Sequence, residues 1–322
     1  MEIKWLNPDA SFEKLILVGD IGGTNTNLGI VGYKNEKYTI ILETVWSSSS
    51  LSGLAEPLAE TLKLAKEHSP HLQPTQCCIS AAGPVSNNRC VMTNLKWSID
   101  GNDLSTAIGL PVLVINDFVA ISYGILTLDT EDPSQIYKLP HLDGSTPNPA
   151  PATKAVIGPG TGMGVSFLAC DGKEHIPASS EGGHIAFAPF DEDSISFWNY
   201  LREKSGGSPV VEHFVSGIGI INLYEWWKHT KGIPNNAAFE KIEATPEHDR
   251  PKYISRASDT DPVAAEMMRL FVKMLARFAS DVSTLLLPFG GLYLAGGTVQ
   301  KDLRWLERDS LFMKYFEKNN NP

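Results

Sequence analysis

The sequence predicts an α/β protein with a duplicated architecture, chiefly because it contains two glycine-threonine hairpins. The first occupies residues 15–31 and the second residues 154–169. In each, an apolar run is followed by a turn of Gly and Thr and then by another apolar run, as in a β-hairpin. Such a turn leaves backbone N–H groups open to an anion, and Thr hydroxyls complete the cradle. Two of them, each opening an α/β unit, predict a fold that holds a polyphosphate from both sides of a cleft.

The first half of the chain is expected to contain short strands and one early helix. Five small or apolar residues recur at helical spacing between Leu51 and Ala65. Pro57 predicts that the regular helix begins near it, since proline is tolerated only in the first turn. Residues 129–151, rich in Pro, Asp, Ser and Asn, are expected to form a linker or a long surface loop. The expected strands are residues 15–18, 28–31, 38–45, 76–81 and 112–115.

A second unit begins at Lys154 with its own strand, turn and strand. Asp261 is expected to cap a helix that has Pro262 at its first position. A strand over residues 291–295 and a third glycine turn, residues 296–298, follow. The helix carries an apolar stripe that we expect to pack in the core: Val263, Met267, Leu270, Phe271, Met274 and Phe278.

Composition narrows the class of protein. The chain has 322 residues, 42% of them hydrophobic and 20% charged, which is typical of a globular protein with one large or two medium domains. A net charge of −10 without a Lys/Arg run argues against nucleic-acid binding. The most apolar stretch, residues 285–295, is broken by Pro288 and two glycines and is too short to span a bilayer. We therefore expect neither nucleic acid nor membrane as a partner.

The cysteines and the N-terminus indicate a reduced, cytoplasmic protein. Residues 1–10 show no apolar core or cleavage pattern of a secretion signal. None of the four cysteines shows C-x-x-C spacing, and Cys77 and Cys78, adjacent on a β-type run, would point to opposite faces of a sheet.

The first turn offers a candidate magnesium contact. Neither hairpin matches a Walker A or a G-x-G-x-x-G motif. Asp20 lies beside the turn glycines, with Thr24 and Thr26 as possible hydroxyl donors. A carboxylate beside a phosphate is repelled unless Mg²⁺ mediates, directly or through its waters. The alternative, that Asp20 simply caps a tight turn, is equally open from these residues alone.

A polar pair, Asn116 and Asp117, ends the apolar strand 112–115. The carboxyl end of a buried strand is where α/β folds bind ligands. Asp117 has the chemistry of a general base, and Asn116 offers a donor and an acceptor that suit a sugar hydroxyl. The alternative is that Asp117 is the N-cap of the next helix.

Three further segments contain groups suited to a small polar ligand. Residues 180–184 bring Glu181 and His184 around two glycines, residues 212–217 add Glu212, and Asn94 adds an amide in a short polar turn. The alternatives are a metal site at His184 and His213 and plain surface polarity for the glutamates. No pair of histidines has the i, i+4 spacing of a zinc enzyme helix, so metal ligation is disfavoured.

Together these motifs closely resemble the bacterial-type ATP-dependent glucokinases of the actin/hexokinase/Hsp70 superfamily, almost from end to end. The matching motifs are Gly-Asp-Ile-Gly-Gly-Thr-Asn (19–25), Met-Thr-Asn-Leu-Lys-Trp (92–97), Ile-Asn-Asp-Phe (115–118), Gly-Pro-Gly-Thr-Gly-Met-Gly (158–164), Glu-Gly-Gly-His (181–184), Glu-His-Phe-Val-Ser-Gly (212–217) and Ala-Gly-Gly-Thr (295–298).

The resemblance implies two ribonuclease-H-like α/β domains with mixed sheets that flank a central cleft. We expect a small domain over residues 1–127 and a large one over residues 128–322. Relatives continue with a strand and a small-residue helix that return to the small domain, whereas this sequence stops at residues 319–322. That return is therefore expected to be absent here, through truncation or an unrecorded tail.

The resemblance also implies the reaction, the transfer of the γ-phosphoryl group of MgATP to the 6-hydroxyl of D-glucose in the first step of glycolysis. Asp117 would be the base, and Asp20 would reach Mg²⁺ through water. A homodimer is what relatives suggest. The other sugar hydroxyls would be held by Asn94, Asn116, Glu181, His184 and Glu212. The nucleotide would be held by Asp20, Gly22, Gly23, Thr24, Asn25, Gly160, Thr161, Gly162, Gly296, Gly297 and Thr298.

Two rival functions remain open from the sequence. The related repressor/ORF/kinase family carries a cysteine-rich zinc motif shortly after its Glu-x-Gly-His, but here no cysteine follows Cys170. This argues against that branch, yet a kinase for fructose or mannose would look similar. A non-catalytic ATP-dependent switch of the same superfamily would keep both hairpins but would not need the polar cluster around Asp117.

Overall fold

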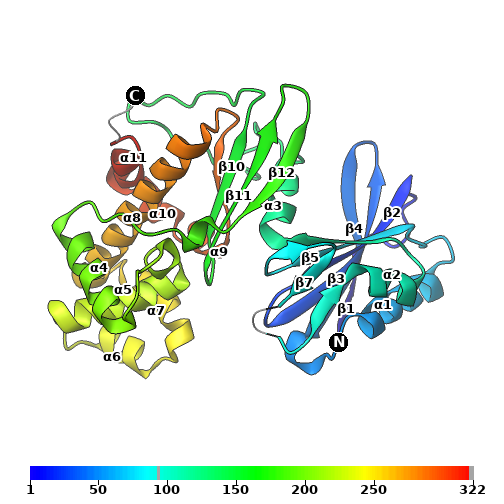
Figure 1. Ribbon diagram of the computed structural model, residues 1–322, viewed down its shortest axis with the longest axis horizontal. Helices are drawn as coiled ribbons and strands as arrows, with labels where there is room; N and C mark the ends of the chain where they lie inside the picture. Colours follow the sequence, from blue (N-terminus) through cyan, green and yellow to red (C-terminus); the bar gives the residue numbers. More distant parts are fainter. Residues whose placement is uncertain (93–94, 319–322) are drawn as a thin grey trace. The chain divides into compact units, whose positions relative to one another are not determined.

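The computed structural model describes residues 1–92 and 95–318 and divides the chain into two units, Met1–Ala120 and Ile121–Pro322 (Figure 1). Each unit is an α/β structure built on a mixed sheet, as the sequence predicts. Helix α3, Asp117–Ile125, runs across the boundary. The domain limits expected at residues 127 and 128 stay a prediction.

The first unit is organised around a six-stranded sheet in the order β1-β4-β3-β2-β5-β9. The pairs β1–β4, β4–β3 and β3–β2 are antiparallel. Strands β2, β5 and β9 run parallel to one another. A small antiparallel sheet is formed by β6, β7 and β8. The elements are β1 Glu2–Trp5, β2 Lys14–Ile21, β3 Asn25–Lys34, β4 Lys37–Ser47, η1 Ser48–Ser50, α1 Ala55–His68, β5 Gln76–Ala81, β6 Val85–Ser86, β7 Arg89–Val91, β8 Ser98–Asp100, α2 Gly101–Ile108 and β9 Val112–Asn116.

Alternating burial explains why these segments form a sheet. On β2, β5 and β9, Leu17, Ile79 and Val114 are buried in the core of this unit, together with Leu58 of α1. Pro57 is the third residue of α1, so the first turn tolerates it as expected. All five strands expected in this half of the chain are confirmed.

The second unit contains the sheet β12-β11-β10-β13. Its strands are β10 Lys154–Pro159, β11 Met163–Cys170, β12 His175–Ser180 and β13 Leu292–Leu294. Strand β10 pairs antiparallel with β11 and parallel with β13. Strand β2 of the first unit likewise pairs antiparallel with β3 and parallel with β5. This shared pattern around each hairpin confirms the predicted duplication.

Helices form most of the core of the second unit and lie largely on one side of its sheet (Figure 1). The longest, α8, begins with Asp261 as its N-cap, whose Oδ1 accepts hydrogen bonds from the N–H groups of Val263 and Ala264. The predicted stripe on α8 packs in this core. The helices are α4 Glu192–Ser205, α5 Gly217–Thr230, α6 Ala237–Ala244, α7 Arg250–Ala257, α8 Pro262–Leu286, α9 Gly297–Lys301, α10 Leu303–Glu307 and α11 Leu311–Phe316, with short 3-10 turns η2 Gly182–His184, η3 Val211–His213, η4 Glu247–Asp249 and η5 Arg308–Ser310.

Residues 129–151 form the long loop that the sequence predicts, with no helix or strand over this fully described range. Its middle is fixed by Glu317, whose Oε1 lies 2.8 Å from Nδ1 of His141 and accepts a hydrogen bond from the N–H of Leu142. The loop is therefore anchored to the C-terminal end of the described chain.

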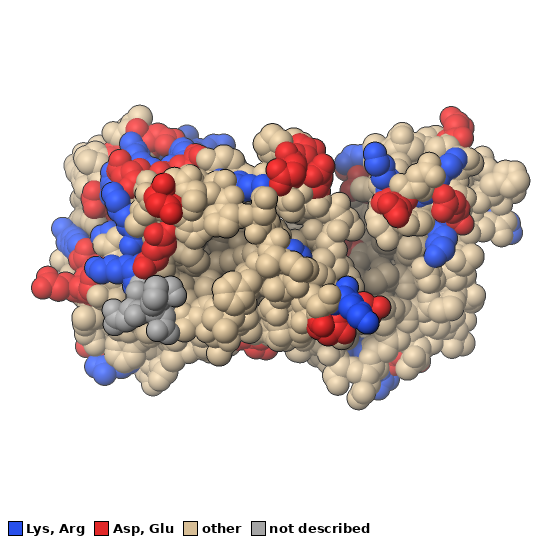
Figure 2. All heavy atoms as spheres, turned by 90° about the horizontal axis from the view of Figure 1, so that it is seen from above, with Lys and Arg blue, Asp and Glu red and all other residues tan. Residues whose placement is uncertain are grey.

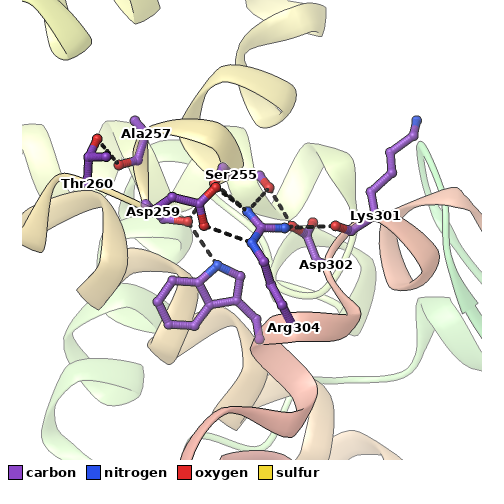
Figure 3. A network of polar contacts seen from close by, with 9 residues as sticks. Ser255, Ala257, Asp259, Thr260, Lys301, Asp302 and Arg304 are labelled. Carbon is purple, nitrogen blue, oxygen red and sulfur yellow. Dashed lines mark hydrogen bonds and ion pairs between the residues drawn. The ribbon is translucent and has the colours of Figure 1, made fainter.

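Arg304, in the first turn of α10, binds this helix to α7 and to the turn that follows α7 (Figure 3). Arg304 Nη2 donates to the carbonyl of Ser255 at 2.8 Å, and Arg304 Nε donates to Asp259 Oδ1 at 2.8 Å. Arg304 Nη1 also contacts Asp302, whose buried carboxylate accepts a hydrogen bond from the Ser255 hydroxyl. Burial raises the pKa of Asp302, and its two partners offset part of that effect. This network holds the helices that follow the third glycine turn.

Surface charges are mixed: Lys and Arg alternate with Asp and Glu on the face shown in Figure 2. Among the described residues, no helix combines the length and apolarity that a bilayer crossing requires. The cysteines are free thiols, and Cys77 is buried on β5 while Cys78 faces the other side of the sheet. Burial, with Cys78 adding to it, raises the pKa of Cys77 to about 12.

Candidate functional site

The first glycine turn joins β2 to β3 and presents an exposed polar edge. The N–H of Gly22 donates to the carbonyl of Asn25 at 2.9 Å, which closes the turn. Gly23, Thr24 and Asn25 are exposed, as is Asp20 at the end of β2. The turn therefore leaves four of the five predicted residues accessible, whereas Gly22 is half-buried and its N–H is already bonded.

Ser48 of η1 holds this turn in place. Its hydroxyl donates to the carbonyl of Gly22 at 2.8 Å and lies 2.9 Å from the hydroxyl of Thr26. Its N–H donates to the carbonyl of Thr24 at 2.9 Å. Thr26 is fully buried, so its expected role as a hydroxyl donor to a ligand is wrong, and Thr24 is the accessible hydroxyl.

The strand register brings Asp20 and Asn116 to one edge of the sheet. Asp20 on β2 lies opposite Ser80 on β5, and Ala81 on β5 lies opposite Asn116 on β9. Because these three strands are parallel, their carboxyl ends meet at the same edge, where α/β folds place ligands.

Asn116, and not Asp117, caps helix α3. Its Oδ1 accepts hydrogen bonds from the N–H groups of Phe118 at 2.9 Å and Val119 at 3.3 Å. Its Nδ2 donates to the carbonyl of Gly83 at 3.0 Å and to Asp117 Oδ1 at 2.9 Å. The alternative that Asp117 serves as the N-cap is therefore wrong, and Asp117 is the first helical residue. Whether Asn116 also binds sugar stays a prediction.

Asp117 is oriented by its neighbours and is a stronger base than an ordinary aspartate. Its Oδ1 accepts the bond from Asn116 and one from the N–H of Phe118 at 3.0 Å. Burial raises the pKa of Asp117, the hydrogen bond from Phe118 offsets part of the rise, and the negative charge of Asp20 adds to it.

The second glycine turn joins β10 to β11 and is tied to helix α5. The N–H of Gly160 donates to the carbonyl of Gly162 at 2.8 Å. The carbonyls of Gly160 and Thr161 accept hydrogen bonds from the N–H groups of Gly217 at 2.8 Å and Ile218 at 3.2 Å. The side chain of Thr161 is exposed, so its hydroxyl is accessible, as the prediction requires.

The third glycine turn lies beside the second. Strands β10 and β13 are parallel, with Ile157 opposite Leu294, so both turns follow carboxyl ends at one edge of the sheet. Gly296 has φ +93°, and a Cβ there would lie 3.2 Å from the carbonyl of Pro159. Both the left-handed backbone and the close approach favour glycine. Lys301, not singled out from the sequence, places Nζ 3.8 Å from the position of a Cβ on Gly297.

Glu181, His184 and Glu212 come together in the second unit. His184 Nδ1 lies 3.1 Å from Glu181 Oε2, and His184 Nε2 lies 3.9 Å from Glu212 Oε1. Glu212 Oε2 accepts a hydrogen bond from the N–H of Met163 at 2.9 Å. The resemblance groups these three residues, and the structure brings them within these distances of one another.

His184 and His213 are the alternative metal ligands, and His213 makes a different contact. Nδ1 of His213 accepts a hydrogen bond from the N–H of Val210 at 3.3 Å. Within the described ranges, His, Cys, Asp and Glu form no group of three or more that could hold a metal ion. Asn94 lies outside the described residues, so its expected contact with the sugar stays a prediction.

Comparison with known proteins places the whole chain in one family. The family model described as Glucokinase matches residues 17–321. The chain is 33% identical over 319 residues to the glucokinase of Nostoc sp. strain PCC 7120, an alignment that covers 94% of this chain and 90% of the relative. It is 34% identical over 306 residues to the glucokinase of Helicobacter pylori strain J99, covering 94% of this chain and 85% of the relative.

Solved structures agree with this placement. The crystal structure of a glucokinase from an Antarctic psychrotroph matches with a TM-score of 0.77 at 26% identity, over 96% of this chain and 90% of that one. A ROK family glucokinase from Streptomyces griseus, solved with glucose and AMPPNP, matches with a TM-score of 0.60 at 19% identity, over 95% of this chain and 91% of that one. The second likeness concerns the fold alone.

Proposed function

The chain belongs to the glucokinase family, and on that premise we propose that it transfers the γ-phosphoryl group of MgATP to the 6-hydroxyl of D-glucose. The products are glucose 6-phosphate and ADP. Phosphoryl transfer requires little covalent chemistry from a protein, because positioning and charge stabilisation supply most of the catalysis.

The observation that carries the proposal is the orientation of the Asp117 carboxylate together with its raised pKa. Two hydrogen bonds fix its Oδ1, and burial together with the charge of Asp20 raises its pKa. A carboxylate with a raised pKa and one oriented oxygen is suited to accept the proton of an attacking hydroxyl. A nucleotide-dependent switch has no need of such a base.

In this proposal the sugar is recognised by paired hydroxyl contacts. Glu181, His184 and Glu212 form one cluster in the second unit, and Asn94 and Asn116 add amides. A site built to hydrogen-bond a hydroxyl rejects an analogue that lacks it, by roughly 10⁴-fold in strong cases.

The phosphates are held by the first two glycine turns. Donors to the β- and γ-phosphates come from residues 22–25 and 160–162, of which Gly23, Thr24, Asn25 and Thr161 are exposed and Gly22, Gly160 and Gly162 are half-buried, and residues 296–298 take the adenosine. Because the net charge is −10, Mg²⁺ has to neutralise part of the nucleotide charge. The exposed carboxylate of Asp20 fits Mg²⁺ that arrives with ATP and is contacted through water.

A panel of sugars tests the proposal. The purified chain is incubated with MgATP and with D-glucose, D-fructose, D-mannose or no sugar, and ADP release is followed continuously. We expect kcat/KM for glucose to exceed that for the other hexoses at least tenfold, and ATP hydrolysis without sugar to be slow. Faster turnover of fructose or mannose would reassign the substrate, and ADP release independent of any sugar would contradict a kinase.

The remaining parts of the proposal are a cytoplasmic location and a homodimer. The four free thiols fit a reducing compartment, and the dimer rests on what relatives suggest. Sedimentation velocity at micromolar concentration tests the dimer: a single species at the monomer mass of 35.2 kDa would contradict it.

A further inference from the structure

Glu212 lies in the cluster with Glu181 and His184 that is proposed to bind the sugar. It also supports the second glycine turn, residues 160–162, which is proposed to bind phosphate. Its Oε2 accepts the hydrogen bond from Met163, the residue directly after that turn, while its Oε1 faces His184. The side chain of Glu212 is 22% exposed, against 65% for Glu181. Of the two glutamates, only Glu212 has a hydrogen bond to the β10–β11 hairpin among the described residues.

Gly162 leaves the space that this carboxylate occupies. A Cβ on Gly162 would lie 2.2 Å from Glu212 Oε2 and 3.0 Å from its carboxyl carbon. Distances of this kind force the carboxylate to move. Glycine is therefore needed at residue 162 to seat Glu212, in addition to any contact with phosphate.

The backbone of the same segment reinforces the contact. Gly217 and Ile218, which follow Glu212, donate hydrogen bonds to the carbonyls of Gly160 and Thr161. In the segment that carries Glu181 and His184, a Cβ on Gly183 would lie 2.0 Å from the carbonyl of Met163. The turn is thus packed directly against both segments that carry sugar-type residues.

We infer that Glu212 is a positioning residue that couples sugar binding to the phosphate turn. This inference rests on the proposed function. A sugar hydroxyl that binds Glu212 fixes its carboxylate, and the carboxylate fixes the N–H of Met163 and with it the conformation of Gly162. Phosphate then binds a turn that is already ordered. Because coupling between two ligands is reciprocal, bound nucleotide also strengthens glucose binding.

Calorimetry measures this coupling without turnover. Binding of Mg-AMPPNP is titrated with no sugar and with saturating glucose, and the ratio of the two dissociation constants is the coupling factor. For the unmodified chain we expect a factor of at least about five, the lower end of typical couplings between sites. In Glu212→Ala the factor is expected to fall to about one, the value for uncoupled sites.

Glu181→Ala is the matched control. It removes a carboxylate from the same cluster that does not contact the turn, so glucose binds more weakly while the coupling factor at saturating glucose is retained. Glu212→Gln keeps an amide oxygen that accepts from Met163 and is expected to recover coupling that the Ala variant loses. Equal coupling factors in Glu212→Ala and the unmodified chain would overturn the inference.

A second pair of variants tests the contact from the nucleotide side. Gly162→Ala displaces Glu212 and is expected to weaken glucose binding at least about tenfold with no nucleotide present, equal to about 1.4 kcal/mol. Gly160→Ala alters the same turn, but its Cβ meets nothing closer than 3.9 Å, so glucose affinity should stay within about twofold of the unmodified chain, a change of less than about 0.5 kcal/mol. Unchanged glucose affinity in Gly162→Ala would contradict the inference.

The results separate this inference from the proposed function. If the unmodified chain phosphorylates glucose but shows a coupling factor near one, the inference fails and the proposed function stands. If the unmodified chain binds AMPPNP but no glucose, the proposed function fails and the inference fails with it.

Discussion

Replacing Asp117 by Asn isolates the proposed proton transfer from sugar binding. Asparagine has nearly the same shape and keeps an oxygen at the Oδ1 position. The hydrogen bonds of 2.9 Å from Asn116 Nδ2 and 3.0 Å from the N–H of Phe118 therefore persist. The change is confined to Oδ2, where an NH₂ group that cannot accept a proton replaces the carboxylate oxygen.

The expected effect follows from that single change. General base catalysis contributes about 10²–10⁴-fold to a rate, so kcat should fall by that factor. This corresponds to about 2.7–5.5 kcal/mol added to the activation barrier. Glucose affinity, measured by calorimetry without nucleotide, should change by less than about threefold, or about 0.7 kcal/mol, because the supporting hydrogen bonds remain.

Steady-state kinetics of ADP release, run beside the glucose titration, measures both quantities. Asn116→Ala serves as a comparison, because it removes the contact to Oδ1, together with the cap of α3 and the bond to Gly83, while Asp117 keeps its carboxylate. Its kcat should fall less than that of Asp117→Asn. A kcat for Asp117→Asn within about threefold of the unmodified chain, far below the effect of a lost general base, would refute the role of Asp117.

Three further predictions concern the stability of the folded chain. Ser48→Ala leaves the buried Thr26 hydroxyl without its partner, so it should lower the free energy of unfolding by about 1–3 kcal/mol and raise KM for ATP. Ser49→Ala changes an exposed side chain and should have neither effect. Equal urea midpoints for the two variants would contradict this prediction. Because the folded chain raises the pKa of Asp117, it binds this proton more tightly than the unfolded chain, so the contribution of Asp117 to stability falls as pH rises through the raised pKa. Asp117→Asn should accordingly be more stable than the unmodified chain at pH 7, and its advantage should shrink as pH falls toward the ordinary aspartate pKa of about 4; an advantage that does not vary with pH in urea titrations would argue against the raised pKa. Arg304→Ala leaves a buried carboxylate with fewer partners and should cost about 1–3 kcal/mol in urea unfolding, and an unchanged midpoint would show that the network adds no stability.

Local patterns were sufficient to predict much of the fold. Glycine turns between β-branched runs identified both hairpins, Pro57 marked the first turn of α1, and the Asp261–Pro262 pair marked the start of α8. Each signal acts within a few residues, so an isolated sequence contains it. The predicted α/β class is confirmed, and the prediction of a glucokinase, made from seven ordered motifs, is confirmed by the family match over residues 17–321.

Contacts between distant segments could not be predicted in this way. Ser48 lies 22 residues from Thr26, in a run of serines that suggests only an exposed turn. Glu212 lies 49 residues from Met163, and no spacing rule joins a glutamate to one particular backbone N–H. Asn116, which caps α3 through Oδ1, also donates from Nδ2 to the carbonyl of Gly83, 33 residues away, and no local pattern shows that contact.

The position of the transferred phosphoryl group tests the central claim most directly. The purified chain is incubated with MgATP and uniformly ¹³C-labelled D-glucose, and the product is examined by ¹³C and ³¹P NMR. Transfer to the 6-hydroxyl predicts phosphorus coupling to C6 and C5 of the sugar, and Asp117→Asn should form this product at an initial rate at least about 100-fold lower. Phosphorus coupling to C1, or ADP formed without any phosphorylated sugar, would contradict the account.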